Sequence, residues 1–217
     1  MQLTPVQVRI LGCLVEKERT TPDNYPLTMN ALLNACNQTT NRHPVVSLTE
    51  ATVQNALENL RAAGLLRVDF SRSNRAEKYR HVLDEVLDAS DAELALLGVL
   101  MVRGPQTSAE LRARSERLHR FADQAAVDAT LDRLADRQEP LVVRLAPGPG
   151  LKEARWAHLL AGETPPDAVA PAPGPARSGR ADRIDALESA LALLTAEVGR
   201  LRADHEALSA RLKDLLD

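Results

Sequence analysis

Residues 47–70 read SLTEATVQNALENLRAAGLLRVDF, and this stretch decides the fold. Val53, Leu57 and Leu60 recur at the three- and four-residue spacing of one apolar helix face. Gly64 stands where a helix commonly ends, and an apolar run follows it directly. The stretch therefore predicts an amphipathic helix joined to a β-strand by a very short turn.

A charged hairpin and two further helices complete the unit. Strands are expected at about 65–70 and 77–82, on either side of a polar turn at 71–76. Apolar periodicity predicts one helix from Pro5 to about Lys17 and a second that begins near Thr28. Three helices followed by a charged hairpin are typical of a winged helix-turn-helix, which usually binds nucleic acid through its third helix and its wing.

The first 160 residues contain this order twice. Gly12 recurs as Gly98 at an offset of 86, and Leu57 recurs as Leu131 at an offset of 74. The offset falls by 12 because the first copy has extra residues between its first and third helices. Two matched blocks in the same order, each followed by a hairpin, predict a duplicated unit.

The predicted fold class is therefore mainly α, with α+β wings. We expect two tandem winged helix-turn-helix domains at residues 1–83 and 84–161. Residues 162–180 are rich in Pro, Ala and Gly and are expected to form a linker. Residues 181–217 are expected to form a C-terminal coiled-coil helix.

The tail has the most regular apolar pattern of the chain. Its apolar residues alternate spacings of three and four, which favours a parallel homodimer, and His205 is the one polar residue at an a position. The alternative is a helix that folds back onto the domains. The predicted dimerisation residues are Ile184, Leu187, Leu191, Leu194, Val198, Leu201, Leu208, Leu212 and Leu215.

Composition narrows the class of protein. Aromatic residues make up only 2% of the chain, which argues against base-stacking platforms for single-stranded nucleic acid. Cys13 and Cys36 lack metal-site spacing and are expected to be buried thiols. No secretory signal pattern opens the chain, and no apolar run is long enough for a membrane span. We expect a cytoplasmic protein without membrane contact.

The two copies differ in net charge. The whole chain has a net charge of −3. Residues 1–82 contain ten Lys and Arg against seven Asp and Glu, a net charge of +3, whereas residues 83–160 contain ten against thirteen, a net charge of −3. Only the first copy has the charge that favours binding to DNA.

The candidate DNA-binding residues all lie in the first copy. Its third helix turns polar side chains away from the apolar face, and Asn and Gln amides pair well with adenine edges. The hairpin adds cations for phosphates, although an ordinary solvated hairpin has the same composition. The candidates are Thr52, Gln54, Asn55 and Asn59 for bases, and Arg42, Arg72, Arg75 and Lys78 for phosphates.

An alternative function is a protein-binding scaffold that does not bind DNA. Glu58 lies on the polar face of the first copy's third helix, where it would repel phosphates. In the second copy the corresponding face includes Asp132 and Asp136. The polar loop at 37–43 is expected either to contact a partner or to form local hydrogen bonds.

Nothing in the sequence indicates catalysis. The five His residues show no metal-ligand spacing with each other or with Cys, and no glycine-rich loop is placed to hold a phosphate. We therefore expect no catalytic residues, no metal and no cofactor.

Several stretches resemble a known family. They are Thr21–Leu27, Asn34–Arg42 with Pro44 and Val45, Arg103–Thr107, Glu110–Arg112 and Val142–Ala146. On these residues the chain resembles the YceH-like family of uncharacterised bacterial proteins, over almost its whole length. The resemblance implies a tandem winged-helix fold with a heptad tail and transfers no catalytic residue.

Overall fold

The computed structural model describes residues 2–69, 76–147 and 153–162. All of these residues fall in one compact unit. The predicted phosphate contacts Arg72 and Arg75, the predicted linker and the predicted dimerisation residues from Ile184 to Leu215 lie outside the described residues. The described part is mainly α-helical, with two small antiparallel sheets.

The first half consists of three main helices and a hairpin, as predicted, with a short third strand added. Its elements are α1 (Pro5–Thr20), a 3-10 turn (Pro22–Asn24), β1 (Leu27–Thr28), α2 (Met29–Cys36), α3 (Glu50–Ala62), β2 (Leu66–Asp69) and β3 (Lys78–His81). The strand order in the sheet is β1-β3-β2, so β3 is central. Two residues of β1, which the sequence analysis missed, pair with Tyr79 and Lys78.

The second half repeats the order of three helices and a hairpin. The short helix α4 (Leu83–Leu87), also missed from the sequence, connects the halves. The elements that follow are α5 (Asp91–Arg103), α6 (Ser108–Ser115), α7 (Gln124–Ala135), β4 (Val142–Leu145) and β5 (Arg155–His158). These helices and strands follow the order that the sequence predicts for the second copy.

Side-chain caps explain where several helices begin. Thr4 and Ser90 each form a capping box, with Gln7 and Glu93 respectively, at the first helix of each half. Thr49 accepts a hydrogen bond from the backbone of Thr52 and caps α3. Each cap pairs a backbone N–H that the helix itself leaves without a partner.

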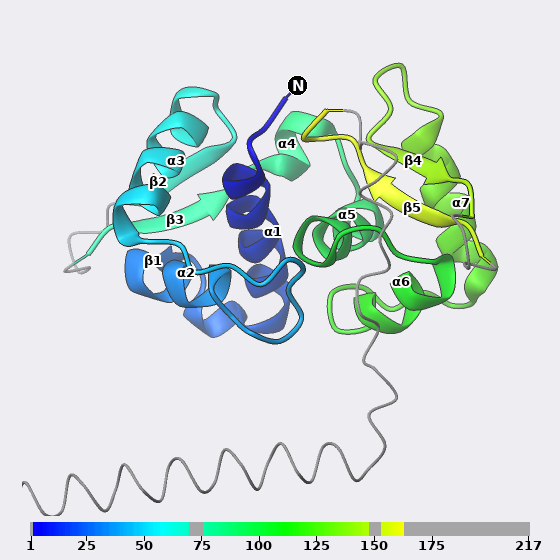
Figure 1. The fold of residues 1–217 in the computed structure, drawn as a ribbon, viewed down its shortest axis with the longest axis horizontal. Helices are drawn as coiled ribbons and strands as arrows, with labels where there is room; N and C mark the ends of the chain where they lie inside the picture. Colours follow the sequence, from blue (N-terminus) through cyan, green and yellow to red (C-terminus); the bar gives the residue numbers. More distant parts are fainter. Residues whose placement is uncertain (1, 70–75, 148–152, 163–217) are drawn as a thin grey trace, which may run out of the picture. The chain divides into compact units, whose positions relative to one another are not determined.

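The two halves meet through α1 and α5, which pack against each other (Figure 1). The packing is close at two glycines: a Cβ atom at Gly12 would lie 2.8 Å from the Cβ atom of Met101, and one at Gly98 would lie 2.8 Å from a methyl carbon of Val15. The offset of 86 that relates Gly12 to Gly98 also relates Val15 to Met101. The contact is therefore pseudo-symmetric, as in the isologous interface of a homodimer.

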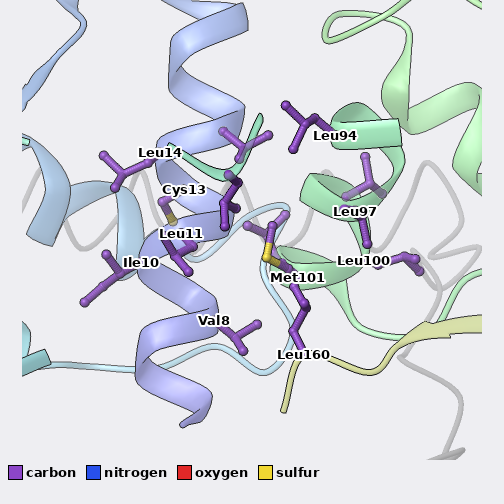
Figure 2. Packing of buried hydrophobic residues seen from close by; sticks show 14 of the residues in the cluster. Val8, Ile10, Leu11, Cys13, Leu14, Leu94, Leu97, Leu100, Met101 and Leu160 are labelled. Atoms are coloured by element: carbon purple, nitrogen blue, oxygen red, sulfur yellow. The ribbon is translucent and has the colours of Figure 1, made fainter. Parts of the chain in front are cut away.

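Buried side chains from both halves form one continuous hydrophobic cluster. Figure 2 shows part of it, with Leu11 and Leu14 of α1 on one side and Leu97 and Met101 of α5 on the other. Both predicted thiols, Cys13 and Cys36, are buried and free, which confirms that expectation. Because the cluster is shared, we expect the halves to depend on each other for stability.

Replacing either glycine tests the close helix contact. Gly12→Ala should lower the free energy of unfolding by up to about 2 kcal/mol, because overpacking costs about 1–3 kcal/mol and better helix propensity offsets about 1 of this. Gly98→Ala should act in the same direction, since the atom it meets is a methyl carbon of Val15, a buried β-branched side chain with little freedom to move. Urea denaturation measures both.

Gly64 provides the control, because it has a φ of 71° and no atom lies within 4 Å of its added Cβ. Gly64→Asn should change stability by less than about 0.5 kcal/mol, as Asn tolerates this conformation. If Gly12→Ala instead stabilised the protein, the close contact between α1 and α5 at Gly12 would not be required for stability.

Candidate nucleic-acid interface

The outer face of α3 is the centre of the candidate interface. Val53, Leu57 and Leu60 are buried, which turns the opposite side of the helix towards solvent. Thr52, Asn55 and Asn59 are exposed there, and Gln54 is half-buried. The residue types and their exposure agree with the predicted base-reading face, while contact with DNA stays a prediction.

The polar side chains of this face are ordered by hydrogen bonds along the helix. Asn59 Nδ2 donates to Asn55 Oδ1 over 3.1 Å, and Gln54 Nε2 donates to Glu58 Oε1 over 3.0 Å. Each amide keeps further donor or acceptor positions, because one bond uses only part of its capacity. Glu58 remains exposed and would repel phosphates, but its carboxylate is partly occupied by Gln54.

Lys78 is the one predicted phosphate contact of the hairpin within the described residues. It is half-buried at the start of β3, where Asp69 of β2 lies opposite. Cross-strand pairs of opposite charge are neighbours on one sheet face and weaken each other's field. Lys78 therefore offers less positive potential than its sequence position suggests.

Arg42 is not available to bind phosphate, which corrects the prediction for this residue. Its side chain is 0% exposed, and its Nη2 atom lies 2.5 Å from Oε2 of Glu16 on α1. Its Nε atom also donates to the carbonyl oxygen of Ala35 over 2.9 Å. A buried guanidinium requires this many partners because burial removes its hydration.

A second buried arginine holds the same loop. Arg9 of α1 donates to the carbonyl oxygens of Cys36 and Pro44, over 3.1 and 2.6 Å. Asn37, the first residue of the loop, is joined to the segment before α3. Its side-chain amide donates to the carbonyl oxygen of Leu48 over 2.9 Å and accepts from the N–H of Leu48 over 2.7 Å. These hydrogen bonds join the polar loop to residues eleven or more positions away in the sequence, whereas local hydrogen bonds were one of the two expectations for it.

The loop also contacts the second half. The backbone N–H of His43 donates to the carbonyl oxygen of Val102, over 2.8 Å, and Arg103 donates to the side chain of Asn41. No apolar periodicity marks Arg9, Glu16 or Asn37 as anchors, so the sequence analysis missed their roles. The extra residues of the first copy therefore help to position α3 relative to α5.

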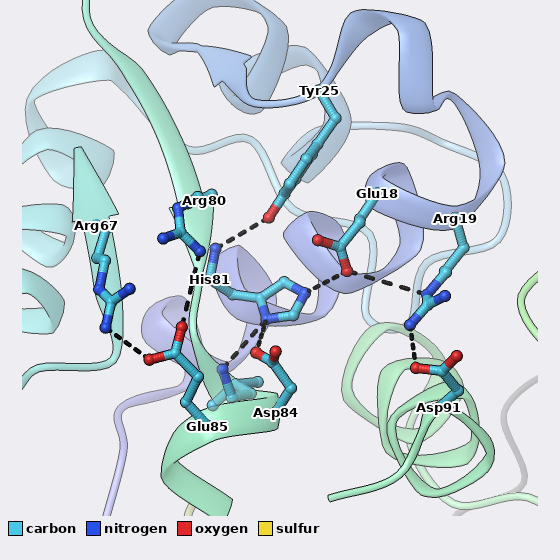
Figure 3. A network of polar contacts seen from close by, with 10 residues as sticks. Glu18, Arg19, Tyr25, Arg67, Arg80, His81, Asp84, Glu85 and Asp91 are labelled. Carbon is cyan, nitrogen blue, oxygen red and sulfur yellow. Dashed lines mark hydrogen bonds and ion pairs between the residues drawn. The ribbon is translucent and has the colours of Figure 1, made fainter. Parts of the chain in front are cut away.

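Several other cations of the first half are neutralised by acidic residues (Figure 3). Arg67 and Arg80 lie opposite each other in the hairpin. Oε2 of Glu85 on α4 lies 2.6 Å from Nη2 of Arg67, and its Oε1 lies 4.0 Å from Nη1 of Arg80. Arg19 pairs with Asp91 at the start of α5. These pairs leave less free positive charge than the sequence count of +3 implies.

His81 lies at the centre of the same network. Its side chain is 1% exposed, and its Nε2 atom lies 3.0 Å from Oε2 of Glu18. Its Nδ1 atom accepts a hydrogen bond from the backbone of Leu83, so Nε2 carries the proton that is donated to Glu18. Tyr25 accepts from the backbone N–H of His81, and burial raises the pKa of its hydroxyl. The network ties α1 to the end of β3 and has a structural role.

The second half lacks the polar reading face. At an offset of 74, the four positions proposed to read bases are occupied by Ala126, Asp128, Ala129 and Arg133. Asp132, at the position of Glu58, is exposed on α7 as predicted. The face has lost all three amides that could pair with base edges, and the charges of Asp128 and Arg133 take the place of two of them.

Two other kinds of site are absent from the described residues. Among residues 2–69, 76–147 and 153–162, no group of three or more His, Cys, Asp or Glu is arranged to hold a metal ion. Within the same ranges, no helix has both the length and the apolar character needed to cross a bilayer.

The fold defines a mainly α-helical protein with two small antiparallel sheets, and comparison with known proteins defines its family. Residues 3–151 match the family model described as "Protein of unknown function, DUF480". A UPF0502 protein of Leptothrix cholodnii is 47% identical over 215 residues, which cover 99% of this chain and 94% of that protein. A UPF0502 protein of Geotalea uraniireducens is 50% identical over 205 residues, covering 94% and 91%. The chain belongs to the DUF480/UPF0502 family, which confirms the resemblance found in the sequence.

The buried ion pair leads to a stability prediction. Arg42→Met should lower the free energy of unfolding by about 3 kcal/mol, because it leaves Glu16 largely buried without its cation. Arg61→Met, which removes an exposed guanidinium from α3, should change stability by less than about 0.5 kcal/mol. Equal effects in thermal or urea unfolding would contradict a structural role for Arg42.

Proposed function

We propose that this protein is a DNA-binding regulatory protein, in which each half is a winged helix-turn-helix and the first half contacts the duplex. The observation that carries the proposal is the outer face of α3, where Thr52, Asn55 and Asn59 are exposed beside a charged hairpin. The protein acts by binding, without catalysis, metal or cofactor.

The two kinds of contact divide between helix and hairpin. Amides of Gln54, Asn55 and Asn59 are suited to the donor and acceptor pattern of adenine in the major groove. Lys78, together with Arg72 and Arg75 of the hairpin turn, supplies the cations that hold phosphates. Because α3 itself has a single cation, Arg61, binding by one protomer is weak and depends on a second protomer.

The heptad tail supplies that second protomer. We propose that residues 181–217 form a parallel coiled coil between two copies, so that two first halves act on one duplex in the cytoplasm. Linking two weak sites in this way raises the apparent affinity without any new contact with DNA.

Fluorescence anisotropy of the full chain with a labelled random duplex tests DNA binding. Binding is expected at low salt, with affinity that falls steeply as salt rises. The triple variant Arg72→Ala/Arg75→Ala/Lys78→Ala should weaken binding and reduce the slope of log affinity against log salt by roughly 3 per protomer. Asn55→Ala should instead alter sequence preference and leave that slope unchanged.

Arg117→Ala is the matched control, because it removes an exposed cation from the second half. It should leave the affinity within about twofold of the parent value. Absence of binding at low salt, or binding that salt does not affect, would overturn the proposal.

Removing the tail tests the dimer separately. A chain that ends at residue 180 should remain folded and sediment as a monomer, since the continuous core of the described unit lies before residue 163. The full chain should sediment as a dimer, and Leu194→Asp/Leu201→Asp should convert it to a monomer. A truncated chain that still sediments as a dimer would show that the domains themselves associate.

A further inference from the structure

The second half contains an open groove of about 990 Å³ between α7, the start of α6 and the β4–β5 hairpin. Its apolar lining includes Trp156 of β5 and Leu145 of β4, together with several alanines. Asp128 and Asp132 line it from α7, and Glu153 lines it from the segment before β5. The groove thus combines an apolar surface with carboxylates.

The apolar side of the groove is held in place by the backbone. The N–H of Trp156 donates to the carbonyl of Gln106 over 2.7 Å, and the N–H of Gln106 donates to the carbonyl of Trp156 over 3.0 Å. This isolated bridge fixes β5 against the segment that precedes α6. Trp156 itself is 6% exposed, so its ring is packed before any partner arrives. A preformed surface lowers the entropy that binding must overcome.

Among residues 2–69, 76–147 and 153–162, the carboxylates of the groove have no ion-pair partner. Within the described part of the chain, Asp128, Asp132 and Glu153 make no ion pair, and Arg144 is the one cation in the lining. The described lining residues therefore have a net negative charge. An unpaired acidic groove attracts a positively charged partner and disfavours nucleic acid.

The duplication shows that this groove differs from its counterpart. Asp128 stands at the position of Gln54 in the first half, and Ala129 stands at that of Asn55. In the hairpins, by contrast, the strand register places Arg155 of the second half at the position of Lys78, so the difference in charge lies on the helices. The second half thus has a carboxylate, Asp128, where the first half has the neutral amide of Gln54.

We propose that this groove binds a basic segment of a partner protein, in which arginines or lysines meet Asp128, Asp132 and Glu153 and an apolar side chain contacts Trp156. The partner is identified by this chemistry alone. The proposal goes beyond DNA binding by the first half and does not depend on it, because it uses none of the residues proposed to contact DNA.

Trp156 is the only tryptophan of the chain, so its fluorescence reports directly on the groove. The probe is a ten-residue peptide with four Arg and two Leu in a Gly/Ser background, without aromatic residues. Titration of the full chain with this peptide should change the Trp156 emission to saturation, and added salt should weaken binding. A peptide with Glu in place of Arg should not bind.

Variants separate the groove from general surface charge. Asp128→Asn/Asp132→Asn should weaken peptide binding by roughly tenfold. Asp88→Asn/Asp136→Asn removes the same charge from exposed positions of the second half outside the groove and should weaken it by less than about twofold. Asp128→Lys/Asp132→Lys should bind the Glu peptide in preference to the Arg peptide, an exchange that loss of folding cannot produce.

The following outcomes would overturn the proposal. The proposal fails if the basic peptide does not change Trp156 emission, or if both double Asn variants weaken binding equally. Self-association of the truncated chain that disappears in Asp128→Asn/Asp132→Asn would assign the groove to a second copy. Duplex binding that is lost in this variant, and retained in the hairpin triple variant, would assign it to DNA and would also contradict the proposed function of the first half.

Discussion

The close packing of α1 against α5 is the constraint on which the rest of the structure depends. It requires a residue without a Cβ at Gly12 and Gly98, and the two glycines face Met101 and Val15 in a pseudo-symmetric manner. Each half alone would expose this apolar helix face, so the hydrophobic effect favours the pair. The two units of the duplication therefore pack as the protomers of a homodimer would, within a single chain.

This arrangement frees the outer surfaces of the two halves to diverge. The buried positions of the two copies match, since Val53, Leu57 and Leu60 have counterparts in α7, whereas the exposed positions do not. Amides remain on α3, and Asp128 and Asp132 appear on α7. In the proposed account, the first half has a surface suited to DNA and the second half has a groove suited to a basic peptide. The protein would then link a nucleic acid to a partner protein.

The sequence predicted the repeated order of elements because that order depends on local periodicity and caps, as at Thr49 and Ser90. It also predicted the exposure of Asn55 and Asn59, which follows from the helical period. It failed for Arg42, because whether a loop cation meets Glu16 or solvent depends on contacts between distant segments. β1 and α4 were missed for a related reason: two strand residues and five helix residues are too short to show a period.

Hydrogen exchange of backbone amides tests the central claim most directly, namely that one shared core unites the two halves. The account predicts that the buried amides of α1 and α5 belong to the slowest class and exchange at one common free energy, that of global unfolding. Separate free energies for α1 and α5, with one half opening while the other stays protected, would contradict it.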